Sequence, residues 1–379
     1  MAEPGGAPGT DPYDATLSDG ENGALELPDL ALPDLASRAL RGSVVAASDE
    51  FFAEKENLIT PGAPTFTPRE FGHKGQVYDG WETRRRRGPA GSPGSPGSLP
   101  GPDDCDWAVV RLGAAGVVRA VVVDTAFFTG NYPASCSVEG CRVAGYPEAL
   151  SSSSVSWVPL VARSPLSGDA RHVFDVSSGR RFTHVRLRIY PDGGVARLRV
   201  HGQVVCDPSL VAGLTFDLAA VENGGDVVAC SDRFYSSPRN VLAPGLARVM
   251  GDGWETRRRR GDGHEWLVVR LAGLSAVSLA EIDTSLYIGN SPGAASLAGF
   301  SGSAEAVPPA SPGAWFPLLP RTALLPDTPH RFRIPDSPPV THVRLDVFPD
   351  GGIARLRLHG SLTEAGLAGV RRRWDETAG

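Results

Sequence analysis

Hydrophobic and polar positions alternate in several short stretches of the chain, and this period of two predicts β-strands. Over 185–189 apolar residues are separated by arginines, and the same alternation returns over 195–200. Such a pattern is typical of a strand with one buried face. The runs 107–112 and 117–123 are rich in β-branched residues and predict two further strands, which 113–116 separates. The chain is therefore predicted to be mainly β.

Turn residues separate the predicted strands. Pro191-Asp192-Gly193-Gly194 lies between two of them, where proline fixes φ and glycine accepts a positive φ. A strand, a tight turn and a strand predict a β-hairpin. One short helix is predicted over 210–221.

The chain contains the same sequence unit twice. The nine residues 79–87, Asp-Gly-Trp-Glu-Thr-Arg-Arg-Arg-Arg, recur without change at 252–260. Other pairs match in the same order: Trp107 and Trp266, Asp124 and Asp283, Asn131 and Asn290, Gly193-Gly194 and Gly351-Gly352, and His201-Gly202 and His359-Gly360. A block of this length does not recur by chance, so we infer an internal duplication. The first copy also has a Gly-, Ser- and Pro-rich insertion at 88–98, which predicts a surface loop without chemistry.

Each copy is predicted to fold as a β-sandwich of the jelly-roll type, because short strands recur over a unit of about 150 residues. The order of signals also resembles the discoidin, or galactose-binding-like, sandwich. The fold class is thus all-β with two tandem domains. The predicted boundaries are a disordered segment at 1–25, repeat 1 at 26–205, a linker at 206–226, repeat 2 at 227–362 and a C-terminal tail at 363–379.

Composition narrows the possible partners. Lys and Arg total 37 and Asp and Glu total 43, so the net charge is −6, which argues against nucleic acid despite the arginine runs. No apolar run approaches the roughly 20 residues of a membrane helix. The N-terminus lacks the pattern of a secretory signal, so we expect a cytoplasmic protein. Of the five cysteines, Cys136 and Cys141 could form a bridge, but a reduced protein is favoured.

The repeated block carries the first candidate chemistry. If 81–87 is extended, Trp81, Thr83, Arg85 and Arg87 face one way, and Glu82, Arg84 and Arg86 face the other. Arginine grips a carboxylate with two hydrogen bonds, and a glutamate held ionised between arginines could act as a base. The alternative is a surface ladder of Arg–Glu pairs.

Other polar residues mark strand ends. Asp124 and Asn131, like Asp283 and Asn290, follow a predicted strand and form either a turn or part of a ligand-binding rim. We expect the strand-end histidines to serve packing and hydrogen bonding and the arginines of the last strand to lie on a solvated face. These residues are His201, His359, Arg197, Arg199, Arg355 and Arg357.

The two repeats differ in charge. Repeat 1 contains Glu50, Glu54, Lys55 and Glu56, and His73-Lys74 just before the repeated block, and repeat 2 has no equivalent histidine or lysine there. If only one repeat carries a complete catalytic set, repeat 1 is therefore favoured, with His73 as an acid or base near neutral pH. An ordinary loop histidine is the alternative.

Two long segments, 42–59 and 71–85, resemble the allantoicase family, and the resemblance extends from about residue 30 to residue 360. It implies a cytosolic protein of two jelly rolls that associates into homo-oligomers. The implied reaction is hydrolysis of allantoate to ureidoglycolate and urea, a step of purine and allantoin breakdown. Composition and periodicity do not lead to this activity. The alternatives are a non-catalytic tandem module for carbohydrate or a small anion, and a structural scaffold.

The reaction suggests roles for the candidate residues. Glu82 and His73 are the expected acid–base pair, and Asp79 is expected to orient the loop or a metal. The expected substrate-binding residues are Arg84, Arg86, Asn131 and Asp124, with Glu255, Arg257, Arg259 and Asn290 in repeat 2. No cofactor is firmly predicted. A divalent metal is possible because hydrolases of ureido compounds often use one, although no compact cluster of ligands stands out.

Overall fold

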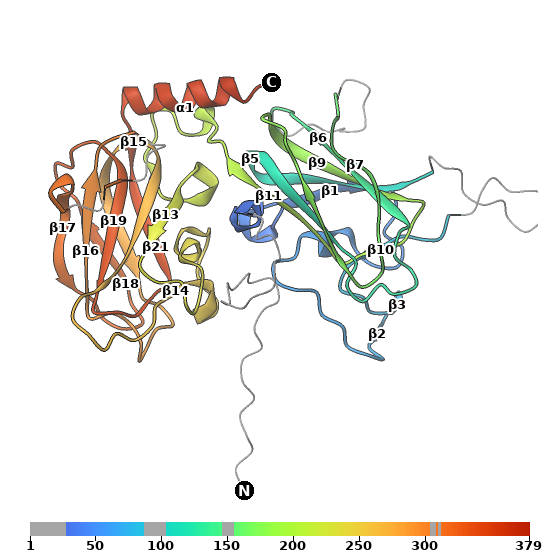
Figure 1. Ribbon diagram of the computed structural model, residues 1–379, viewed down its shortest axis with the longest axis horizontal. Helices are drawn as coiled ribbons and strands as arrows, with labels where there is room; N and C mark the ends of the chain where they lie inside the picture. Colours follow the sequence, from blue (N-terminus) through green and yellow to red (C-terminus); the bar gives the residue numbers. More distant parts are fainter. Residues whose placement is uncertain (1–27, 87–103, 146–154, 304–307, 310–311) are drawn as a thin grey trace, which may run out of the picture. The chain divides into compact units, whose positions relative to one another are not determined.

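The computed structural model describes residues 28–86, 104–145, 155–303, 308–309 and 312–379. The segment 1–25, Arg87 and the insertion at 88–98 lie outside these residues. The described chain is built of strands with one α-helix, which confirms the all-β class, and it divides into two compact units (Figure 1). Unit 1 comprises Met1–Gly113, Val118–Ser178 and Phe182–Gly202, and unit 2 comprises Ala114–Val117, Gly179–Arg181 and Gln203–Gly379.

Repeat 1 is organised around one long strand. Its strands are β1 (Ser43–Ala47), β2 (Phe71–Gly72), β3 (Gly75–Gln76), β4 (Trp81–Glu82), β5 (Asp106–Asp124), β6 (Ser135–Cys141), β7 (Val158–Pro165), β8 (Arg171–Asp175), β9 (Arg181–Tyr190), β10 (Gly194–Val195) and β11 (Arg197–Val204). The main sheet has the order β1-β5-β9-β6-β7, and β8 and β11 also pair with β5. A separate small sheet pairs β4 with β10.

Repeat 2 has the same plan. Its strands are β12 (Phe216–Asp217), β13 (Asp226–Cys230), β14 (Trp254–Glu255), β15 (Glu265–Asp283), β16 (Ala294–Phe300), β17 (Phe316–Ala323), β18 (Pro329–Arg333), β19 (Val340–Phe348), β20 (Gly352–Ile353) and β21 (Arg355–Leu362). The main sheet runs β12-β21-β15-β19-β16-β17, and β14 pairs with β20 as β4 pairs with β10.

The long central strand corrects two predictions. The segments 107–112 and 117–123 belong to one 19-residue strand, β5. The predicted hairpin is also wrong, because its two arms pair with the central strand. In repeat 2, β19 pairs with Glu265–Ser275 of β15 and β21 with Ser275–Asp283. A long strand whose halves pair with different partners contributes to both layers of a sandwich, which local periodicity does not reveal.

The predicted helix at 210–221 is absent. That segment contains the 3-10 turn Pro208–Leu210, the strand β12 and the start of the 3-10 turn Val221–Asn223. The α-helix is instead α1 (Glu364–Glu376), in the segment predicted as a tail, and the Thr363 side chain caps it by accepting a hydrogen bond from the Gly366 amide. None of the described helices is long and apolar enough to cross a membrane.

Two further expectations, on the cysteines and on the arginines of the last strand, concern side chains that are buried. Cys136 and Cys141 are free, and burial raises the pKa of each thiol to about 12, which makes them unreactive. The arginines of the last strand do not form a solvated face: Arg197, Arg199 and Arg355 are buried. They are tolerated inside because backbone carbonyls and aspartates satisfy their donors, as for Arg197, which donates to the Asp79 carbonyl and carboxylate at 2.8 and 2.7 Å.

Candidate active site

The repeated block is anchored by its tryptophan. Trp81 is fully buried, and its indole nitrogen donates to the Asp49 carbonyl at 2.8 Å. Its neighbour Glu82 pairs with Gly194 on one side and exchanges backbone hydrogen bonds with Ala53 on the other. Because Trp81 points inward, the next side chain points outward, so Glu82 is presented at the edge of the sandwich from a backbone held on both sides.

The structure brings together two of the predicted site residues, Glu82 and Asn131. The Asn131 side-chain amide donates to Glu82 Oε1 at 2.7 Å. Burial raises the pKa of Glu82 above its ordinary value, and the smaller opposing effects of Asn131 and the Arg85 charge do not cancel it. Glu82 is therefore a half-buried carboxyl group with an affinity for protons above that of an ordinary glutamate.

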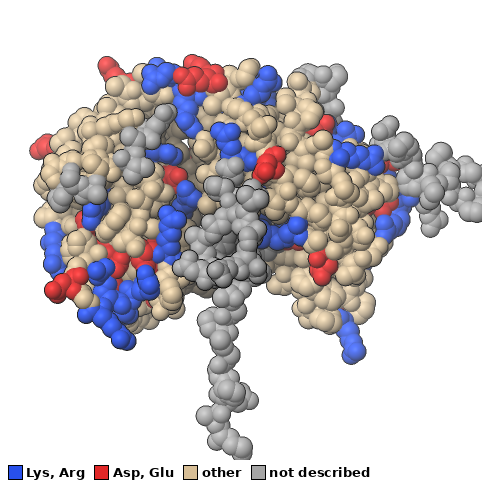
Figure 2. All heavy atoms as spheres, viewed as in Figure 1, with Lys and Arg blue, Asp and Glu red and all other residues tan. Residues whose placement is uncertain are grey.

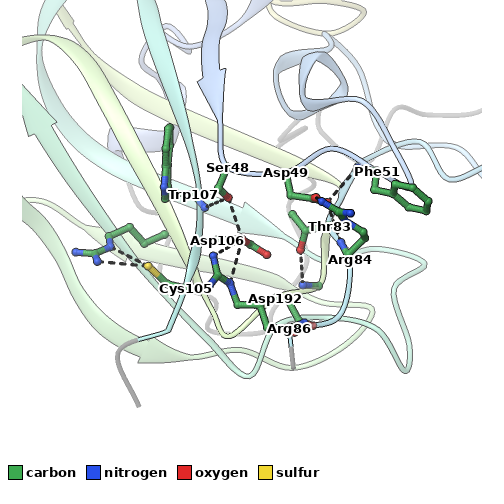
Figure 3. A network of polar contacts seen from close by, with 12 residues as sticks. Ser48, Asp49, Phe51, Thr83, Arg84, Arg86, Cys105, Asp106, Trp107 and Asp192 are labelled. Atoms are coloured by element: carbon green, nitrogen blue, oxygen red, sulfur yellow. Dashed lines mark hydrogen bonds and ion pairs between the residues drawn. The ribbon is translucent and has the colours of Figure 1, made fainter. Parts of the chain in front are cut away.

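The flanking arginines are bound to other carboxylates. Arg84 binds Asp49 through its amide and its guanidinium, at 2.9 and 2.8 Å, and Arg86 binds Asp106 at 2.8 Å (Figure 3). The predicted surface ladder to Glu82 is thus absent. Arg84 nevertheless keeps a largely exposed side chain that lies 5.2 Å from the Phe51 ring centre. It stays available to an anionic ligand, whereas Arg86 mainly fixes the block to the sheet.

Arg85 is a candidate site residue that the sequence analysis did not single out. Its guanidinium donates to Asp192 at 2.9 Å and to the Gly130 carbonyl at 3.2 Å, immediately before Asn131. Its side chain is 57% exposed, and its charge acts on Glu82. Simple alternation placed Arg85 on the same side as Trp81, but β4 ends at Glu82 and the alternation of buried and exposed side chains fails at Arg85. Arg85 is therefore the arginine whose charge lowers the pKa of the candidate carboxyl group, against the larger effect of burial.

Asp79 and Asp124 have structural contacts. The Asp79 carboxylate accepts from Arg197 at 2.7 Å and from the Thr65 amide at 2.9 Å. Burial alone would raise the pKa of Asp79, but these hydrogen bonds keep it below its ordinary value. Asp124 is buried, and its side chain accepts from the Ala126 amide in the turn after β5. Asp79 is therefore bonded within its own loop and to Arg197, and Asp124 is a buried side chain of the turn after β5.

The charged residues specific to repeat 1 form one cluster beside Glu82. We call this set the charge cluster; its members are Glu50, Glu54, Lys55, Glu56, His73 and Lys74. Lys74 binds Glu54 at 2.9 Å, and Lys55 binds Glu50 and Glu56 at 3.1 and 3.0 Å. The hydrogen bond from Lys74 keeps the pKa of Glu54 below its ordinary value, and the charge of His73 acts in the same direction. Glu54 directly follows Ala53, which pairs with Glu82.

An aromatic stack supports the loop that carries His73. The Phe127 and Phe66 rings lie 5.7 Å apart, Phe66 and Tyr78 5.5 Å, and Tyr78 and the buried Phe128 5.2 Å. The stack connects the loop after β5, which bears Asn131, to the segment before β4. It therefore joins the two sides of the site in repeat 1.

Repeat 2 reproduces the polar frame. The Asn290 amide donates to Glu255 at 2.6 Å, Arg257 binds Asp232 at 2.8 Å, and Arg259 binds Glu265 at 2.6 Å. The predicted residues of repeat 2 thus occupy positions equivalent to those of repeat 1.

The described part of the chain shows no cluster of metal ligands, and its cavity lies away from the two Glu–Asn pairs. Within 28–86, 104–145, 155–303 and 312–379, no group of three or more His, Cys, Asp or Glu side chains could hold a metal ion. A shallow cavity of about 320 Å³ is lined by residues of unit 2 such as Ser278, Asp336 and Ser361, and it shares no residue with either Glu–Asn pair. Figure 2 shows basic and acidic side chains interspersed over the visible face rather than gathered in a basic patch.

Comparison with known proteins identifies close relatives. A family model described as "Allantoicase repeat" matches residues 33–205 and 216–363. A probable allantoicase of Streptomyces coelicolor is 51% identical over 357 residues, covering 93% of this chain and 92% of that protein, and one of Nocardia farcinica is 54% identical over 333 residues, covering 87% and 94%. The crystal structure of allantoicase from Saccharomyces cerevisiae superposes with a TM-score of 0.68 at 33% identity, covering 87% of this chain and 93% of that one.

Proposed function

This chain belongs to the allantoicase family, and we propose that it hydrolyses allantoate to ureidoglycolate and urea beside the Glu82–Asn131 pair of repeat 1. The observation that supports this location is the position of Glu82, a half-buried carboxyl group flanked by a charge cluster that repeat 2 lacks. An enzyme of this family is not a non-catalytic binding module, so that alternative falls away.

The reaction involves two proton transfers, one to the departing nitrogen and one from the remaining ureido group. The bond from the central carbon to one ureido nitrogen breaks, the departing nitrogen takes a proton to give urea, and water supplies the hydroxyl group that the carbon gains. The remaining ureido group can lend its nitrogen electron pair while the bond breaks if a base accepts its N–H proton. A carboxyl group with a raised pKa suits the transfer, because it holds a proton more readily than an ordinary glutamate and can still release it.

Glu82 and His73 share this work in the proposal. Glu82 delivers or accepts the proton at the ureido nitrogen, while Asn131 fixes its Oε1 and leaves Oε2 toward the ligand. His73 is exposed in the turn between β2 and β3, on the loop that Lys74 joins to Glu54. It serves as the second acid–base group, and Asp79 positions that loop through Thr65 and Arg197.

The substrate carboxylate requires a cation. Arg85 and Arg84 are the candidates in repeat 1, because both guanidinium groups are more than half exposed. Each is held by an aspartate in a fixed orientation, which lowers the entropy cost of binding an anion. Arg86 supports the frame through Asp106 rather than contacting the substrate.

The test is urea release from allantoate by a Glu82→Gln variant. If Glu82 transfers the proton, kcat falls by about 10²–10⁴-fold. Glu70→Gln, an exposed glutamate on the same loop system, is the matched control and should keep wild-type turnover. Near-normal turnover in a folded Glu82→Gln protein would remove Glu82 from the mechanism.

The proposal also covers the location and the oligomeric state of the enzyme. We propose a cytoplasmic homo-oligomer with allantoate as its small-molecule partner. Light scattering coupled to size-exclusion chromatography tests the assembly: a mass of one chain at working concentration would contradict it.

A further inference from the structure

The polar frame around Glu255 in repeat 2 matches that around Glu82 closely. The Asn290–Glu255 distance is 2.6 Å, against 2.7 Å for Asn131–Glu82. Arg258 donates to Asp350 at 3.1 Å and to the Gly289 carbonyl at 2.7 Å, as Arg85 does to its own aspartate and glycine. The groups that would recognise a ligand in repeat 1 are thus also present in repeat 2.

The loop that carries the asparagine is held in an unfavourable backbone conformation in both repeats. Leu286 has φ 74° and its amide donates to Asp327 at 2.7 Å, and Phe127 has φ 67° and donates to Asp169 at 2.8 Å. A left-handed residue other than glycine is disfavoured, and such strain is concentrated at functional sites. Repeat 2 bears this cost although it lacks the charge cluster, so its loop geometry points to a binding role.

The surroundings of the two pairs differ in their acid–base groups. In repeat 2, Ser237 and Pro238 stand where repeat 1 has Glu54 and Lys55, and no histidine or lysine precedes the repeated block. Ser236 accepts a hydrogen bond from the Glu255 amide at 2.9 Å. Met250 and Ile288 are exposed near this pair, and Met250 Sδ accepts a hydrogen bond from Asn290. The site keeps its recognition groups and lacks the groups that would move a proton with Glu255.

We propose that Glu255 and Asn290 form a second binding site, for a small ureido acid, at which no bond is broken. The ligand class rests on the proposed function of repeat 1, whose substrate carries ureido groups and a carboxylate. Among the described residues, nothing is bonded to Glu255 Oε2 or Asn290 Oδ1, so both can accept ureido N–H groups. The Asn290 amide nitrogen also donates to Met250 Sδ at 3.8 Å, and because a thioether is a weak acceptor, a ureido carbonyl can take its place. The exposed Arg257 and Arg258 can bind the carboxylate.

Calorimetric titration of the full chain with hydantoate tests the proposal. Hydantoate has one ureido group and one carboxylate but no second ureido group to leave, so it reports binding alone. We expect two sites per wild-type chain. Glu255→Gln should leave one, because an amide N–H would face the ureido N–H groups, and Glu82→Gln should also leave one. The double variant should bind none. Titration with urea should be at least tenfold weaker, since urea has no carboxylate.

Controls separate binding from folding and from the activity proposal. Glu281→Gln, which loses an ion pair to Arg331 in the same repeat, should keep both sites. Asn290→Asp places two carboxylates side by side and should remove the repeat 2 site if Glu255→Gln proves unstable. A single site in the wild-type chain, unchanged by Glu255→Gln, would overturn the proposal. Urea release that survives Glu82→Gln and disappears in the double variant would also overturn it. Equal turnover in all variants would instead contradict the role of Glu82 in catalysis. The number of hydantoate sites per chain would then still test this inference.

Discussion

Glu82 is a residue whose side-chain direction follows from the sequence and whose chemistry does not. Alternation correctly placed Trp81 and Thr83 inside and Glu82 outside. The partner of Glu82 is Asn131, 49 residues further along the chain, and the arginines next to Glu82 bind other acids. Which carboxylate an arginine meets depends on long-range packing, so the block alone could not predict it.

The raised pKa of Glu82 predicts how the stability of the folded protein depends on pH. A carboxyl group with a folded pKa above its unfolded value destabilises the folded protein when it is ionised, and this penalty disappears as pH falls below the unfolded pKa. Glu82→Gln should therefore melt at a higher temperature than wild type near pH 7–8, by an amount that shrinks toward pH 4. Melting curves across this range check it. The prediction would be contradicted if the melting temperature of Glu82→Gln, relative to wild type, were lower at pH 8 than at pH 4.

At the scale of elements, the turn between β9 and β11 holds the site together. The Gly194 amide donates to the Asn131 carbonyl at 2.8 Å, and Thr83 exchanges hydrogen bonds with Gly193, which has φ 137°. The turn was predicted from its sequence. Its role was not, because the predicted hairpin would have joined its two arms to each other rather than to β5.

Gly194→Ala should damage this element. A Cβ at Gly194 would lie 2.0 Å from the Phe128 ring, so the ring or the turn must move, and the loop with Asn131 moves with it. We expect a loss of about 1–3 kcal/mol in the free energy of unfolding and a fall in kcat for urea release. Gly179→Ala, where a Cβ meets nothing within 4 Å, is the control. Wild-type stability and turnover in Gly194→Ala would show that the close approach is not needed.

Two buried histidines on equivalent strands predict acid sensitivity. Burial, aided by the charge of Arg111 or Arg270, lowers the pKa of His184 in β9 and of His342 in β19 to about 4. Their stabilising contribution is complete above pH 6.5 and is lost as pH falls from there toward 4. Each should cost its unit about 2 kcal/mol between pH 7 and pH 5. Guanidinium unfolding at the two pH values should show a smaller loss in His184→Gln and His342→Gln; equal losses would contradict the assignment.

At the scale of the whole molecule, the duplication provides two equivalent frames with different surroundings. The charge cluster makes repeat 1 the candidate for chemistry, and its absence from repeat 2 leaves there a frame that suits binding alone. The sequence showed this difference in composition. The structure adds that the differing residues lie next to Glu82, because Ala53 pairs with it.

Turnover should survive treatment with a chelator. The Asp79 carboxylate is occupied by Arg197 and Thr65, and the described residues offer no group of three metal ligands. Urea release from allantoate, measured before and after incubation with EDTA, checks this. A loss of activity that a divalent ion restores would move Asp79 and His73 into metal-binding roles.

The sequence by itself determined the duplication, the all-β class and the family, because these depend on repeated identity, on a local period of two and on long characteristic segments. Only the tertiary structure decided that β5 is one strand serving both layers, that Arg197 is buried and that Asn131 meets Glu82. These features arise from contacts between distant segments, and the burial that raises the pKa of Glu82 exists only once those segments have packed around it.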